Sequence, residues 1–160
     1  MILVDIVLFL IILSFIGRGY RNGFVESLGE LVGAVIAFLA ARFFAPGFGQ
    51  ILVLLMPGRL GLAQFVGFVL VFVVVLRLIG WLFTLADSLL KIITSLPIIS
   101  SLDKVIGAVL GIFTGIVFVG SVTYTVLTLH FDPTLMTWLG GSTVARWSMS
   151  AFTSVLRFLL

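Results

Sequence analysis

The sequence contains no cysteine, which excludes disulfide bonds, thiolate metal sites and a cysteine nucleophile. Charge is also scarce, because 9% of the 160 residues are charged, whereas roughly a quarter are charged in an ordinary soluble domain. Apolar residues make up 62% of the chain. This composition excludes a soluble globular protein and indicates that the chain is solvated by lipid. The chain is also too short for several domains, so we expect one membrane domain over residues 1–160.

Several functional classes lack the residues they need. The nine basic residues are scattered singly along the chain, so the net charge of +3 does not predict nucleic-acid binding. One histidine and dispersed acids give no recognisable metal site. The sequence contains no P-loop, dinucleotide fingerprint, HExxH motif or nucleophile elbow. We therefore expect no enzyme activity and no cofactor, and an intramembrane enzyme is the least favoured alternative.

Four apolar stretches predict transmembrane helices over approximately 2–16, 24–44, 62–86 and 102–130. The first stretch is shorter than the ~20 residues that usually cross a bilayer. We nevertheless expect a retained membrane helix rather than a signal peptide, because no basic residue precedes its apolar core. Between the second and third stretches, segment 46–61 is bracketed by two Pro-Gly pairs. We expect an interfacial or re-entrant turn there.

Two further segments have polar and apolar residues at helical spacing. They cover approximately residues 87–96, where Pro97 follows, and residues 144–160. Such patterns are typical of helices that lie in the membrane interface, with Trp138 and Trp147 as anchors. The predicted fold class is thus an all-α membrane protein with about four transmembrane helices and interfacial amphipathic helices.

Small residues recur at four-residue spacing in two of the predicted spans. Gly107, Gly111 and Gly115 line one face of the fourth span as a glycine zipper, and Gly29 and Gly33 do so in the second. A face without side chains allows another backbone to approach closely. We therefore expect these two helices to pack against each other. Packing inside the monomer is the favoured interpretation, and a homo-oligomer contact is the alternative.

Counting the spans places most charged residues at one mouth of the bundle. This predicted polar cluster comprises Arg18, Arg21, Glu26, Glu30, Arg77, Asp87, Asp103 and Lys104. One interpretation is a structural ion-pair network that fixes helix ends. The other is that Asp103 or Glu26 changes protonation or contacts a permeating ion. Asp5 lies at the opposite mouth, where we expect it to compensate its helix dipole.

Two segments resemble the bacterial colicin V production (CvpA) family. Asp5 followed by RGYRNGFVE (residues 18–26) is similar to the family's Arg-Gly and Gly-Phe turn before a Glu, and LDKVIGAVLGIFTG (residues 102–115) is similar to its Leu-Asp-basic-x-x-Gly run. Thr114 stands where many relatives carry a basic residue. Ser142 is a weak counterpart of the family's C-terminal serine region.

The resemblance implies a multi-pass protein of the bacterial inner (cytoplasmic) membrane, linked to colicin V production or export and to envelope physiology. It implies no known reaction. The first functional hypothesis is a non-enzymatic protein that acts through helix–helix contacts with other membrane proteins or with copies of itself. The alternative is a small oligomeric channel or transporter whose polar mouth contains Glu26, Arg77 and Asp103. The lipid bilayer is the expected environment under both hypotheses, and neither involves nucleic acid.

Overall fold

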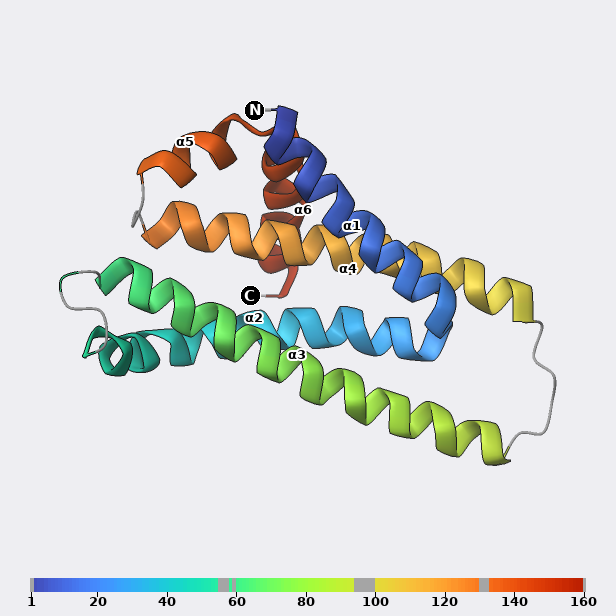
Figure 1. Ribbon diagram of the computed structural model, residues 1–160. Coiled ribbons are helices and arrows are strands. Elements are labelled where there is room, and N and C mark those ends of the chain that lie inside the picture. Colours follow the sequence, from blue (N-terminus) through green and yellow to red (C-terminus); the bar gives the residue numbers. More distant parts are fainter. Residues whose placement is uncertain (1, 55–57, 59, 94–99, 130–132, 160) are drawn as a thin grey trace.

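The computed structural model describes residues 2–54, 58, 60–93, 100–129 and 133–159, and the described chain forms six helices (Figure 1). They are α1 (Ile2–Asn22), α2 (Phe24–Val53), α3 (Leu60–Ile93), α4 (Ser100–Leu129), α5 (Pro133–Gly141) and α6 (Thr143–Leu159). The first four are long and apolar enough to cross a membrane. The predicted fold class is therefore confirmed.

Helix α1 is longer than the predicted span 2–16, because the helix continues through the glycines after it to Asn22. With 21 residues it is about 32 Å long, which matches the hydrocarbon thickness of a bilayer. Gly23 alone separates α1 from α2, with a φ of 84°. The expected glycine-rich turn is thus a single residue in the left-handed region, which glycine adopts without strain.

Helix α2 also extends beyond its predicted end at residue 44. It continues through Pro46 to Val53, so the prediction of a separate turn starting at residue 46 is wrong for its first eight residues. Membrane helices tolerate proline where neighbouring helices stabilise the freed backbone. Here the extension packs on α3, since an added Cβ on Gly49 would lie 3.0 Å from Cα of Gln64. Residues 55–57 and 59 lie outside the described part.

The predicted interfacial helix 87–96 is the continuation of α3, which runs unbroken from Leu60 to Ile93. The rise in polarity after Ala86 does not interrupt the backbone hydrogen bonds, because neither glycine nor proline occurs between residues 81 and 93. Residues 94–99 lie outside the described part, so the predicted end at Pro97 stays a prediction.

The fourth predicted span corresponds to α4, and the tail segment corresponds to α6. In Figure 1, α6 runs across α4 at a steep angle. The apolar face of α6 is buried against the bundle, with Ala145 and Phe152 almost inaccessible. The Phe152 ring meets Phe38 of α2 edge to face, with centroids 4.6 Å apart. The amphipathic pattern of this segment therefore reflects packing on protein as well as any contact with lipid.

Helices α1 and α4 run antiparallel and pack against each other (Figure 1). A Cβ on Gly19 would overlap the carbonyl of Gly107, and one on Gly111 would overlap the carbonyl oxygen of Phe15. Further along, a Cβ on Gly115 would lie 3.1 Å from Cα of Ile12. The glycine stripe of α4 thus brings two backbones into direct contact.

The glycines of α2 face a different helix. A Cβ on Gly29 would overlap the Phe83 ring, and one on Gly33 would lie 3.1 Å from the Ile79 side chain, both on α3. The predicted pairing of the two small-residue stripes is therefore wrong. The α4 stripe accepts the backbone of α1, whereas the α2 stripe accepts large side chains of α3. Both stripes are covered inside one chain.

This packing predicts that Gly111→Ala destabilises the protein by about 1–3 kcal/mol, because the new methyl group meets main-chain atoms that cannot rotate away. Gly17→Ala in α1 is the matched control, since no atom lies within 4 Å of its added Cβ. Equilibrium unfolding in detergent micelles measures the free energy of unfolding of both variants. Equal stability of the two variants would contradict the close α1–α4 contact.

Candidate functional site

A polar cavity of about 440 Å³ opens between α1, α2 and α3. Its walls include aromatic side chains from α1 and α3, Phe15 and Trp81. The polar side chains that line it are Arg18 and Asn22 of α1, Glu26 and Glu30 of α2, and Arg77 and Thr84 of α3. Four members of the predicted polar cluster therefore share one cavity, which lies among helices long and apolar enough to cross a membrane.

The two glutamates of the cavity differ in their partners. Glu26 Oε1 accepts a hydrogen bond of 2.9 Å from Asn22 Nδ2, which ties α2 to α1 across the break at Gly23. One turn further into α2, Glu30 Oε2 is buried and has no hydrogen-bond partner within the described part of the chain. A buried oxygen without a partner is costly. Glu30 therefore has one acceptor oxygen in this cavity that is available to bind.

The basic residues of the cavity come from two helices. The Arg18 guanidinium lies over the Phe15 ring, 4.6 Å from its centroid, a cation–π arrangement. Arg77 enters from α3. Across the ranges that the structure describes, no basic side chain forms an ion pair with Glu26 or Glu30. The ion-pair network expected from the sequence is thus replaced by a shared cavity with two cationic and two acidic side chains.

Asp103 does not line this cavity. Its Oδ1 accepts a 2.9 Å hydrogen bond from the backbone nitrogen of Phe24, so Asp103 caps the N-terminus of α2 from the first turn of α4. A Cβ on Gly23 would overlap the same carboxylate. The predicted grouping of Asp103 with Glu26 and Arg77 is therefore wrong, because the close approach of α4 to α1 directs this acid to a helix end.

Two other residues of the predicted cluster, Lys104 and Arg21, also do not line this cavity. Lys104 is exposed, with Nζ 6.0 Å from the Tyr20 ring centroid. Arg21 is exposed in the last turn of α1. The side chain of Asp87 lies outside the described residues.

Asp5 makes an equivalent cap at the other end of α1. Its Oδ1 accepts hydrogen bonds from Ser142 Oγ at 2.6 Å and from the backbone nitrogen of Val144 at 3.0 Å. Ser142 Oγ in turn accepts a bond from the backbone nitrogen of Ala145. Asp5 occupies the first turn of α1 as expected, but its hydrogen bonds hold the start of α6. A serine 137 positions away completes the cap.

Sequence reasoning missed Asn22, Trp81 and Thr84 as cavity residues. Trp81 and Thr84 follow Arg77 at helical spacing of four and seven residues, so they share its face of α3. Asn22 precedes Glu26 by four residues, a spacing that becomes informative once α1 and α2 are known to join at one residue. Ser142 carried no local signal for its contact with Asp5.

A family model described as Colicin V production protein matches residues 4–153 of the chain. The match includes both capping acids, the link at Gly23, Ser142 and every residue that lines the polar cavity. No curated protein and no solved structure matches the chain.

The Asp5 cap predicts that Asp5→Ala loosens the start of α6. Loss of an N-cap costs about 1 kcal/mol, so we expect backbone amides in the first two turns of α6 to exchange roughly fivefold faster. Hydrogen–deuterium exchange followed by mass spectrometry measures this rate. Ser14→Ala is the control, because this α1 hydroxyl bonds only its own helix at Ile11. Unchanged exchange in α6 would show that Asp5 does not hold this helix.

Proposed function

Because the chain belongs to the Colicin V production protein family, we propose that it supports the production or export of the toxin colicin V, or homeostasis of the cell envelope. We place it in the bacterial inner (cytoplasmic) membrane and assign it no catalytic step. The observation that carries this proposal is the family match over residues 4–153, almost the whole described bundle. Four candidate membrane spans support the membrane role.

We propose that the protein acts through helix contacts with other membrane proteins or with copies of itself. The glycine stripes are covered within the chain, so a partner must use another surface. Helix α3 packs chiefly on α2 and lies at the outer side of the bundle (Figure 1). Its outward face carries exposed large apolar side chains at helical spacing, namely Val74, Leu78, Leu82 and Leu85.

This proposal predicts that the wild-type chain restores toxin to the medium of colicin V-producing bacteria that lack their own family member. Leu78→Ala combined with Leu82→Ala should lower secreted toxin several-fold, because both side chains are more than half exposed on the α3 face. Toxin is measured separately in cells and in medium, and membrane levels of each variant are compared.

The matched control combines Val7→Ala with Leu10→Ala, which removes similar exposed apolar groups from α1. Full restoration by both double variants would remove the α3 face from the mechanism. Failure of the wild-type chain to restore any toxin would contradict the role in production or export.

The alternative function is a small channel or transporter, and the polar cavity favours it. Charged groups inside membrane proteins often mark routes for ions or substrates. Arg18, Glu26, Glu30 and Arg77 share one cavity, and the unpartnered Glu30 oxygen leaves an acceptor free for a guest. Because four helices can hardly enclose a water-filled pore alone, this function requires an oligomer.

Under this alternative, Glu30→Gln and Arg77→Gln should each change flux several-fold in proteoliposomes, monitored with a pH-sensitive dye and an imposed potassium gradient. The physical reason is that each substitution removes a charge from the cavity wall. Arg157→Gln, an exposed arginine at the end of α6, is the control. Absence of flux through the wild-type protein would contradict the channel function. Equal flux through the wild type and all three variants would also contradict it.

A further inference from the structure

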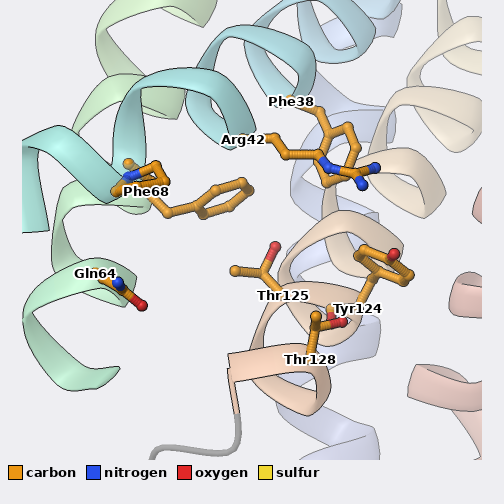
Figure 2. A pocket seen from close by; sticks show the side chains of 9 residues that line it. Phe38, Arg42, Gln64, Phe68, Tyr124, Thr125 and Thr128 are labelled. Carbon is orange, nitrogen blue, oxygen red and sulfur yellow. The ribbon is translucent and has the colours of Figure 1, made fainter. Parts of the chain in front are cut away.

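A second cavity, of about 120 Å³, lies between α2, α3 and α4, apart from the polar cavity described above. Figure 2 shows its principal side chains: Arg42 and Phe38 from α2, Gln64 and Phe68 from α3, and Tyr124 and Thr125 from α4. The Arg42 guanidinium lies beside the Phe38 ring, on the same side of the view as Tyr124. Gln64 and Phe68 lie on the opposite side.

The cavity sits at the far end of the predicted membrane part of α2. Arg42 follows Phe24 by 18 residues (42 minus 24), so it lies about 27 Å along the helix from the Gly23 junction. This separation approaches the ~30 Å thickness of the hydrocarbon core. A bilayer with one boundary at the Gly23 junction would have its other boundary near Arg42, which would put Arg42 at the level of the lipid phosphates.

The hydrogen-bonding groups of this cavity are mostly donors without partners. No hydrogen bond joins the Arg42 guanidinium, the Gln64 amide or the Tyr124 hydroxyl to another group in the described ranges. By contrast, the Thr125 hydroxyl donates to Ser121 of its own helix at 2.8 Å. Arg42 alone has five N–H donors. The free donors therefore suit an anionic oxygen ligand.

The positive charge of Arg42 also lacks a counter-charge on the described side chains. Asp5 and Asp103 cap α6 and α2, whereas Glu26 and Glu30 line the other cavity. A guanidinium close to lipid is costly unless an anion or water neutralises it. Among the described side chains, Arg42 therefore keeps its charge available for an external anion.

The other walls of the cavity are apolar. The Phe38 and Phe68 rings meet edge to face with centroids 6.0 Å apart, and Ala45 and Pro46 complete this side. The ring of Tyr124 lies 6.1 Å from Phe38. A ligand with an anionic oxygen group joined to apolar chains matches this combination of walls.

We propose that this cavity binds the phosphate of an anionic membrane phospholipid. Arg42 binds the phosphate oxygens, Gln64 and Tyr124 donate further hydrogen bonds, and the aromatic walls contact the glycerol and upper acyl carbons. The cavity can hold a group several times the size of a water molecule. The lipid neutralises Arg42 and ties α2, α3 and α4 together at this end of the bundle.

The test uses the full-length, delipidated protein in detergent and dioctanoyl phosphatidylglycerol as the probe, with binding measured by native mass spectrometry. We expect saturable binding of one lipid, and a Kd at least tenfold weaker in Arg42→Gln. Arg157→Gln, which removes the same charge from α6, should bind like wild type. Circular dichroism and size exclusion report whether each variant is folded.

A milder variant keeps the test decisive if Arg42→Gln fails to fold. Tyr124→Phe keeps the ring that packs on Phe38 and Phe152, removes the donor and should weaken binding several-fold. Equal affinity in wild type, Arg42→Gln and Tyr124→Phe would overturn the site. Inorganic phosphate is the competitor that distinguishes the sources of the anion. If inorganic phosphate displaced the bound lipid as effectively as a competing phospholipid does, the phospholipid assignment would be overturned.

Discussion

The direct contact between the backbones of α1 and α4 determines the arrangement of the other elements. Glycines remove the side chains that would hold these two antiparallel helices apart. The first turn of α4 therefore lies beside the junction of α1 and α2, and the first turn of α1 lies beside the start of α6. Each first turn carries an acid that holds a third helix, Asp103 at the start of α2 and Asp5 at the start of α6. Two charges that would be costly in lipid are thus used as helix caps.

The polar cavity follows from the same arrangement. Because α2 starts at Phe24, where Asp103 caps it, its first two turns direct Glu26 and Glu30 toward the cavity that Arg18 of α1 also lines. Helix α3 then packs on Gly29 and Gly33 through Phe83 and Ile79, which places Arg77 at the same cavity. At the other end, Arg42 forms part of a smaller cavity with aromatic walls. The polar cavity therefore carries charges of both signs, whereas the smaller cavity carries a single cation.

Hydropathy and helical spacing predicted the four spans, the amphipathic tail and the glycine stripe of α4. Counting the spans also predicted that Arg18, Glu26, Glu30 and Arg77 gather at one mouth, because the count assigns all four to the same side of the membrane. The partner of the stripe could not be predicted, since small residues permit close approach without specifying the neighbour. Pro46 was wrongly taken as a helix end because its effect depends on packing with α3. The Asp5–Ser142 contact joins residues 137 positions apart, a separation beyond any local pattern.

The absence of cysteine allows a direct measurement of the central contact, because an introduced pair is the only source of a disulfide. A Cβ on Gly115 would lie 3.4 Å from Cβ of Ile12, close to the separation that a disulfide requires. In oxidised membranes, Ile12→Cys combined with Gly115→Cys should form an intramolecular disulfide and leave the chain monomeric on non-reducing gels. Disulfide-linked dimers, or free thiols at both positions, would contradict the α1–α4 contact inside one chain.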